Sequence, residues 1–388
     1  MTMDAGKYDQ EAIDAHRSWR GKVDYSSKPT VANLHDLSVV YTPGVAAPCL
    51  EINKHPEQVW ELTGRGNLVA VVTDGTAVLG LGDIGPTAAL PVMEGKCVLF
   101  KEFAGVDAIA IALDVHEPDQ IVDVVAAIAP SLGGVNLEDI SAPRCFEIER
   151  KLQERVDIPI MHDDQHGTAV VALAAVINAL KITNRTPGGT RTVITGAGAS
   201  GIAVASLLHS YGVEEIALVD SKGLIVPERE DINLYKREVA GWSGRSLNAD
   251  GSIPQIADVL PETDLYIGLS GPGLISPAMI ASMNREALVF PMANPTPEIM
   301  PHLAAEAGAA VIATGRSDFP NQINNALAFP GIFRGLLDAK IPNVTDAHKL
   351  AAAEAIANFV GEPSADRIVP SIFDEGLGQA VAEAVKSS

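Results

Sequence analysis

Short apolar runs alternate with longer segments of helical periodicity along most of the chain. This alternation predicts an α/β protein whose sheets are largely parallel. In the first half we expect helices over residues 9–19, 143–155 and 168–180, a helix from residue 119 that stops at Gly133–Gly134, and strands over residues 107–114, 134–140 and 158–161. Residues 67–82 hold two apolar runs about Asp74–Gly75, which is typical of a β-hairpin.

The alternation restarts after a polar connector at residues 183–189. The strands expected there span residues 192–198, 215–220, 264–270, 287–295 and 310–315, with helices over residues 200–212 and 347–360. The chain therefore divides into an N-terminal α/β substrate domain, residues 1–160, and a C-terminal Rossmann-type domain with a doubly wound parallel sheet and closing helices, residues 161–388.

Composition narrows the class of partner. The 388 residues are 47% hydrophobic and 20% charged, as in an ordinary globular protein, and the net charge is −21. This charge argues against nucleic acid and means that an anionic substrate needs a local cation. Three scattered cysteines (Cys49, Cys97 and Cys145), a start without signal-peptide character and an apolar run too short to span a bilayer predict a cytoplasmic protein without membrane contact.

A nucleotide site is indicated by the segment VITGAGASGIAV. Gly196, Gly198 and Gly201 have the GxGxxG spacing, Ala199 and Ser200 complete the turn, and Asp220 ends the next strand. The alternative is a glycine-rich turn without a ligand, but strand, helix and acid in register favour a dinucleotide. Asp220 favours NAD, whereas Lys222 and the pair Lys236–Arg237 leave NADP open.

Acidic pairs follow two strands that are joined by one helix. Glu138 and Asp139 end the first strand, and Asp163 and Asp164 follow the second. Because such a crossover sets its strands parallel, we expect all four carboxylates at one sheet edge, where a cation must balance them. Oxygen ligands favour Mg²⁺ or Mn²⁺, although His162 and His166 leave a softer metal open. Each pair alone could be a solvated strand end or a helix cap.

Together these motifs resemble those of the malic enzymes, most of all the short bacterial members. The resemblance covers residues 25–335 and follows the family's order. It rests on YTPGVA (41–46), TDGTAVLGLGDIG (73–85), PVMEGK (91–96), LEDI (137–140), HDDQHGTA (162–169), GAGASG (196–201), ANPT (293–296) and NNALAFPG (324–331).

This resemblance implies oxidative decarboxylation of L-malate to pyruvate and CO₂, with NAD or NADP reduced and a divalent metal required. It makes Glu138, Asp139 and Asp164 the metal ligands. Asp163 becomes a catalytic carboxylate residue beside them. Lys96 becomes the general base, as a lysine whose pKa is lowered by burial and the metal, and Tyr41 the general acid. The resemblance also places Asn294 and Asn325 near substrate, and Asn294 near the nicotinamide ribose.

Several alternatives stay open at this stage. Lys101 could act in place of Lys96, and Tyr41 could fill a core edge. Ala77 stands where larger relatives carry an arginine for a substrate carboxylate, so Asn294, Asn325 or backbone NH groups must hold that group. The rival functions are a metal-free dehydrogenase, such as an amino-acid dehydrogenase, and a nucleotide sensor. We expect a homodimer with its site in the cleft between the domains.

Overall fold

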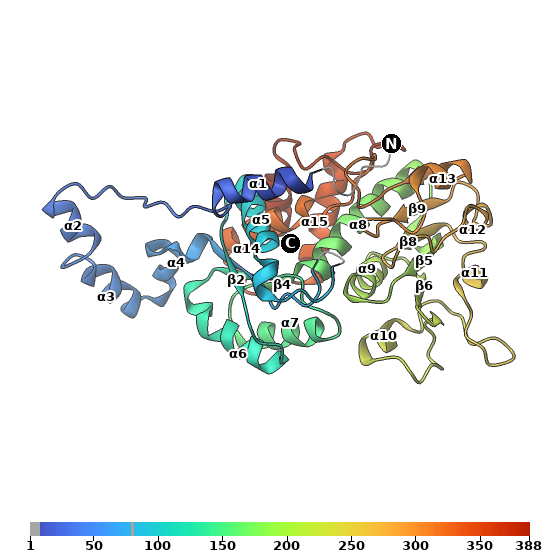
Figure 1. Cartoon of the computed structure of the whole chain (residues 1–388), viewed down its shortest axis with the longest axis horizontal. Helices are drawn as coiled ribbons and strands as arrows, with labels where there is room; N and C mark the ends of the chain where they lie inside the picture. The colour runs from blue at the N-terminus through green and yellow to red at the C-terminus, as the bar shows by residue number, and fades with distance from the viewer. Residues whose placement is uncertain (1–7, 79–80) are drawn as a thin grey trace.

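The computed structural model describes residues 8–78 and 81–388. They form two α/β layers, each consisting of one sheet and the helices that cover it, and one long central helix joins the two layers (Figure 1). The first sheet has the strand order β2-β1-β3-β4 and is parallel throughout. Its strands are β1 (Leu68–Thr73), β2 (Asp107–Ala112), β3 (Gly134–Leu137) and β4 (Ile160–His162). The expected parallel pairing of the two acid-bearing strands is confirmed, since Leu137 pairs with His162.

The second sheet has the order β10-β9-β8-β5-β6-β7, with β7 as its antiparallel edge. The expected doubly wound parallel sheet is confirmed, because the chain moves outward from β5 in both directions. Its strands are β5 (Arg191–Thr195), β6 (Glu215–Asp220), β7 (Gly223–Leu224), β8 (Leu265–Gly268), β9 (Leu288–Pro291) and β10 (Val311–Ile312).

Helices cover both sheets and fill the space between them (Figure 1). Those that precede or cover the first sheet are α1 (Asp9–Trp19), α2 (Leu34–Val40), α3 (Ala46–Lys54), α4 (Val59–Leu62), α5 (Pro86–Ala104), α6 (Pro118–Ile128) and α7 (Arg144–Arg155). The others are α8 (Asp163–Ile182), α9 (Ala199–Ser210), α10 (Leu234–Val239), α11 (Ile256–Val259), α12 (Pro277–Ala281), α13 (Pro301–Glu306), α14 (Phe329–Ala339), α15 (Asp346–Phe359) and α16 (Leu377–Lys386).

Helix α8 connects the two layers. Its 20 residues are long and apolar enough to cross a membrane, yet 78% of the apolar window is buried inside the protein. It packs against α9 and α15, and the amide of Asn178 donates to the carbonyl oxygens of Ala357 and Ile368, 2.8 Å from each. Helix α8 is therefore the core helix of the molecule, and its first turn lies beside the first sheet.

The hairpin expected about Asp74–Gly75 was wrong. Strand β1 lies between two parallel neighbours, and after Thr73 the chain forms a loop in which Val78 bridges Gly82. Gly75 turns this loop with φ of 71°, where a Cβ would lie 2.3 Å from the carbonyl carbon of Gly85. The second apolar run is thus a loop in its described part, because β1 already has a partner on each edge; residues 79–80 lie outside the described residues.

Two helix boundaries also differ from expectation. Helix α6 ends at Ile128, and Gly134 begins β3. Helix α8 starts at Asp163, before Thr168, so the acids Asp163 and Asp164 lie in its first turn. Carboxylates are favoured there by the free NH groups and the positive end of the helix dipole. Periodicity alone marks the apolar part of a helix and misses such a polar first turn.

Residues 25–62 form an N-terminal arm that projects from one end of the molecule through α2 and α3 (Figure 1). No residue of α2 or α3 is buried. Leu34 is 81% exposed, Val39 62% and Leu50 60%, although all three are apolar. Helices this short do not hold together in water without a packing partner.

Candidate active site

Lys96 points from α5 toward the tips of β3 and β4. Its ammonium group lies 2.6 Å from Asp163 Oδ2 and 3.0 Å from Glu138 Oε1, and 4.4 Å from the centre of the Phe329 ring. Lys101, five residues further along the helix, lies on another face, where it bonds Asp107 and is 59% exposed. The structure therefore brings Lys96, and not Lys101, to the acidic cluster.

The acids at the two strand tips converge. Glu138, Asp139 and Asp164 each offer a carboxylate oxygen within 4.8 Å of the others. Asp139 has φ of 54°, a conformation that aspartate tolerates, and its NH donates to Asp164 Oδ2 at 3.0 Å. These three residues are the ones expected as metal ligands, and they come together because β3 and β4 are parallel neighbours.

Asp163 lies beside this group and bonds inward. It is fully buried, and its Oδ2 accepts from Lys96 and, at 3.0 Å, from the amide of Asn325. Asn325 in turn accepts from the Thr168 hydroxyl at 3.0 Å. A Cβ on Gly167 would lie 2.0 Å from Asp163 Oδ1, so the glycine after His166 makes room for the carboxylate.

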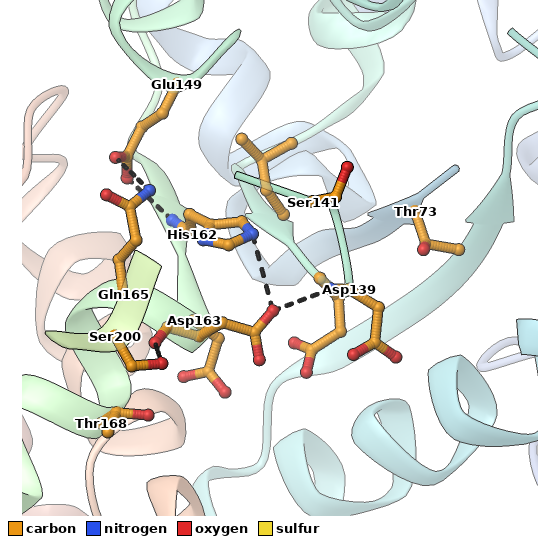
Figure 2. A network of polar contacts seen from close by, with 12 residues as sticks. Thr73, Asp139, Ser141, Glu149, His162, Asp163, Gln165, Thr168 and Ser200 are labelled. Carbon is orange, nitrogen blue, oxygen red and sulfur yellow. Dashed lines mark hydrogen bonds and ion pairs between the residues drawn. The ribbon is translucent and has the colours of Figure 1, made fainter. Parts of the chain in front are cut away.

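A further carboxylate, Glu149 of α7, lies on the far side of His162 from the acidic cluster (Figure 2). Glu149 accepts from the NH of His162 at 2.8 Å, from the Gln165 amide at 3.2 Å and bonds the His166 ring at 2.9 Å. The His162 ring lies 3.6 Å from Asp164 Oδ2. The His166 ring is thus bonded by Glu149, whereas neither ring nitrogen of His162 has a hydrogen-bond partner among the described residues; neither histidine belongs to the three-acid group. This favours a hard cation over a softer metal.

The acidic cluster carries more negative charge than its one neighbouring lysine can balance. Burial raises the pKa of Glu138 well above its ordinary value, and the charges of Asp163, Asp164 and Asp139 raise it further, while Lys96 opposes them. One lysine does not balance this many carboxylates in a buried place. A divalent ion fits this set of donors, because carboxylate oxygens are the usual ligands of Mg²⁺ and Mn²⁺. The positive charge of the ion would offset the negative charges of the carboxylates that bind it.

Lys96 itself is held as an ammonium ion. Burial lowers the pKa of Lys96, but the charges of Asp163 and Glu138 outweigh burial and leave the pKa above that of an ordinary lysine. The lowered pKa expected for a base depends on a bound metal ion, whose positive charge would offset these carboxylates.

The cluster opens into a cavity of about 490 Å³ between the two layers. Lys96, Glu138, Asp139 and Asp164 line one side. The other side is lined by residues that follow strands of the second sheet and by the loop before α14, among them Ser200, Leu269, Ser270, Ala293, Asn294, Asn324 and Asn325. Ala77 also lines the cavity, where its NH donates to the carbonyl oxygen of Asp139. The cleft between the domains was the expected place.

The glycine-rich turn adjoins this cavity. Gly196 has φ of 97°, and a Cβ on Gly201 would lie 1.8 Å from the Gly196 carbonyl oxygen, so both glycines are required by the turn itself. Gly198 is different, because a Cβ there would meet nothing within 4 Å. Ala199 and Ser200 begin α9, and the Ser200 hydroxyl donates to the Asp164 carbonyl oxygen at 2.7 Å. The open face at Gly198 fits the approach of a pyrophosphate.

Asp220 ends β6 but is already engaged. Arg229 donates to both of its oxygens, at 2.9 and 3.1 Å, and Lys236 bonds it at 2.7 Å. Burial alone would raise the pKa of Asp220, but the hydrogen bonds from Arg229 and Lys236 hold it below its ordinary value. The pair Lys236–Arg237 separates in the structure, since Arg237 is exposed.

Tyr41 does not reach this site within one chain. It lies at the end of α2 in the N-terminal arm and is 64% exposed. The described residues that line the cavity do not include it. The arm extends away from the first sheet (Figure 1), so the role of Tyr41 beside Lys96 stays a prediction that one chain alone does not fulfil.

Sequence reasoning missed several residues of the site. Glu149 and Arg229 are a buried glutamate and a buried arginine, and a lone charged residue on a helix or in a loop carries no local signal of burial. Glu298 is a similar case: it is fully buried and accepts from the NH of Ser270 at 2.7 Å and of Ala293 at 3.3 Å. It thereby joins the loops after β8 and β9 that line the cavity. The apolar environment that buries such residues comes from distant segments.

Comparison with family models matches both layers. The description "Malic enzyme, N-terminal domain" matches residues 21–153, and "Malic enzyme, NAD binding domain" matches residues 165–387. The chain belongs to the malic enzyme family. This confirms the resemblance drawn from the motifs.

Known malic enzymes are similar in sequence to this chain over most of its length. The "Bifunctional malic/malolactic enzyme" of Bacillus subtilis is 52% identical over 97% of this chain and 92% of its own length. The NAD-dependent malic enzyme of Geobacillus stearothermophilus is 51% identical, covering 94% of this chain and 76% of that protein. The NADP-dependent malic enzyme of Escherichia coli is 45% identical over 95% of this chain, which spans 48% of that longer protein.

The malic enzyme fold is equally clear. The crystal structure of the NAD-dependent malic enzyme from Thermotoga maritima superposes with a TM-score of 0.92 at 43% identity, covering 97% of this chain and 99% of that one. The two-layer α/β architecture with a parallel NAD-binding sheet is therefore that of the family.

Proposed function

We propose that this chain catalyses the oxidative decarboxylation of L-malate to pyruvate and CO₂, reducing NAD or NADP with a divalent metal ion. The observation that carries the proposal is one cavity lined by three convergent carboxylates, a largely buried lysine and the first turn of the helix that follows the glycine-rich turn. Relatives named NAD-dependent and NADP-dependent malic enzymes support it.

Glu138, Asp139 and Asp164 would hold the metal. A bound Mg²⁺ or Mn²⁺ would polarise the hydroxyl and adjacent carboxylate of malate and, through its charge, lower the pKa of nearby acids. The same charge would offset the carboxylates that raise the pKa of Lys96, so that its neutral amine could take the proton of the malate hydroxyl as general base. The Asp163 carboxylate accepts hydrogen bonds from both Lys96 and Asn325. Asn325 thereby fixes Asp163, and Asp163 orients Lys96. The three convergent carboxylates favour a metal-dependent reaction over a metal-free dehydrogenase.

Asn294 and Asn325 would contact the substrate. Both line the cavity, Asn294 after β9 and Asn325 beside Asp163, and their amides can donate to the remote carboxylate, for which Ala77 offers no charged side chain. Asn294 follows β9 at the carboxyl edge of the second sheet, where a nicotinamide ribose also lies in such folds. The amides of these two residues replace one arginine, which predicts modest affinity for malate.

Tyr41 would act as general acid from a second copy of the chain. The N-terminal arm holds apolar side chains without burial, and a homodimer in which each arm packs on its partner would cover them. Tyr41 of one copy would then deliver a proton to the product enol beside Lys96 of the other. The three free cysteines are typical of a cytoplasmic protein, which is the location that we propose.

One assay tests the proposal. Malate, Mn²⁺ and either NAD or NADP are supplied in parallel, and reduced cofactor and pyruvate are followed together. We expect both products in equal amounts and none after EDTA. Oxaloacetate accumulating without pyruvate, or turnover that survives EDTA, would contradict the proposal. Nucleotide binding without malate-dependent reduction would indicate a sensor.

Metal binding is measured separately by the electron paramagnetic resonance signal of Mn²⁺. Asp164→Asn removes one of the three convergent carboxylates and should weaken Mn²⁺ binding by on the order of tenfold or more. Asp157→Asn, an exposed aspartate before β4, is the matched control and should bind Mn²⁺ as the parent does. Equal loss in both variants would place the ion elsewhere.

A further inference from the structure

Glu298 is a buried carboxylate in the loop between β9 and α13. It is fully buried, and burial raises its pKa above the ordinary value of a glutamate, although hydrogen bonds from Ser270 and Ala293 oppose this. Its donors are neutral NH and OH groups of the chain. Burying a carboxylate among neutral groups costs free energy that an apolar side chain would not cost. The position therefore makes use of the two acceptor oxygens themselves.

The two oxygens of Glu298 hold two different loops. Oε1 accepts from the NH of Ser270 at 2.7 Å and from its hydroxyl at 3.2 Å, in the loop after β8. Oε2 accepts from the NH of Ala293 at 3.3 Å, in the loop after β9. Gly268 makes room for these bonds, because a Cβ there would lie 2.4 Å from the carboxyl carbon of Glu298. The end of β8 is therefore shaped around this carboxylate.

The same network reaches the glycine-rich turn. The Ser270 hydroxyl has a second acceptor in Thr195 Oγ1 at 3.2 Å, and this oxygen is bonded to the Tyr266 hydroxyl at 2.8 Å. Thr195 directly precedes Gly196, where a Cβ would lie 2.2 Å from the carbonyl oxygen of Leu269. The loops after β5, β8 and β9 are thus held against one another at the carboxyl edge of the second sheet, where a dinucleotide binds in such folds.

The loops that Glu298 holds are part of the cavity wall. Leu269, Ser270, Ala293 and Asn294 line the cavity, whereas the fully buried Glu298 acts on it only through them. We propose that Glu298 is a positioning residue for the nicotinamide half of the dinucleotide, because it fixes the two loops that would contact the nicotinamide and its ribose. This rests on the proposed function in placing that half of the cofactor in the cavity.

Glu298→Gln tests this without any turnover. The amide keeps the shape of the side chain but sets an NH₂ group against the NH of either Ser270 or Ala293, so one loop loses its acceptor. NADH and NADPH are both titrated by nicotinamide fluorescence, and we expect binding to weaken by on the order of tenfold, the loss of one hydrogen bond to a charged group. AMP lacks the nicotinamide half, and its dissociation constant, measured by calorimetry, should stay within twofold of the parent.

Glu306→Gln is the matched control, because it removes the same charge from an exposed position of α13 and should leave every dissociation constant unchanged. Near-UV circular dichroism reports whether each variant folds. If Glu298→Gln does not fold, Thr195→Val decides, since it keeps the carboxylate and removes only the hydroxyl beside Ser270. It should weaken binding of the reduced dinucleotide by about threefold and leave AMP binding within twofold.

Unchanged dinucleotide binding in the deciding variant would overturn the proposal, and so would an equal loss of AMP binding. None of these measurements involves malate. A parent that binds NADH or NADPH but does not oxidise malate would contradict the proposed function alone. A parent that oxidises malate, with a folded Glu298→Gln variant that binds the dinucleotide normally, would contradict the role of Glu298 alone.

Discussion

Lys96 Nζ lies 2.6 Å from Oδ2 of the fully buried Asp163, beside the cavity between the two sheets that Lys96 lines. The lysine comes from a helix of the first layer, and the aspartate begins the helix that connects the layers. This pair thus joins the region that would bind the metal to the region that would bind the nucleotide.

Lys96→Ala should lower kcat by on the order of 10²–10⁴-fold, because the proposed base is lost. NADH binding, followed by fluorescence, should stay within twofold and also reports that the variant folds. Lys101→Ala is the matched control, since it removes a lysine from the exposed face of the same helix and should keep full turnover. Loss of NADH binding in Lys96→Ala would assign the lysine to the nucleotide instead.

Tyr41→Phe and Lys96→Ala should each be inactive alone and active when mixed. If Tyr41 acts on the partner, a mixed dimer has one intact site, and random exchange restores about a quarter of parental activity. Equal volumes are incubated until chains exchange, and NAD(P)H formation is then measured. Absence of recovery, with exchange verified by mass labelling, would contradict the shared site.

Gly198→Ala and Gly201→Ala should separate binding from folding. A Cβ at residue 198 meets open space, so the unfolding free energy of Gly198→Ala should stay within about 0.5 kcal/mol of that of the parent. NADH binding by this variant should fall, because the added methyl group blocks the approach of the pyrophosphate. At residue 201 the Cβ meets the Gly196 carbonyl oxygen, which should cost about 1–3 kcal/mol. Urea unfolding and NADH titration check both, and normal NADH binding by Gly198→Ala would refute the placement.

Glu149 should make stability depend on pH in acid. Burial raises the pKa of Glu149, but the charge and hydrogen bond of His166, and then His162, lower it overall. A lowered folded pKa gives stability that is present above the ordinary glutamate pKa of about 4.3 and is lost as pH falls through the folded value. Melting temperatures from pH 7 to pH 3.5 should therefore fall less steeply in Glu149→Gln than in the parent.

Glu147→Gln is the control for that measurement, because Glu147 lies on the same helix and is half-exposed beside Lys151. Its melting curve should keep the slope of the parent. Identical slopes in all three proteins would show that Glu149 is not a source of the acid sensitivity.

Much of the site could be predicted because its residues follow strands that are close in sequence. One crossover joins β3 to β4, so the acids after each had to meet at one edge. The glycine turn is similarly local, with each glycine within one strand–helix unit. Such patterns need few assumptions about distant segments.

The features that sequence analysis missed or predicted wrongly depend on contacts between segments that are far apart in the chain. The Asp74–Gly75 segment has the composition of a hairpin, yet two parallel neighbours had already taken both edges of β1. Arg229 and Glu149 look like surface charges until distant segments bury them. The position of Tyr41 could not be derived from its motif, because the direction of the arm is set by what packs against it.

Helices α2 and α3 lie outside any core that their own chain supplies. If their partner is another copy, chain concentration enters the rate law. Below the dissociation constant of the pair, initial velocity would rise with the square of protein concentration, and it would become linear once association is complete. Dilution alone would then switch turnover off.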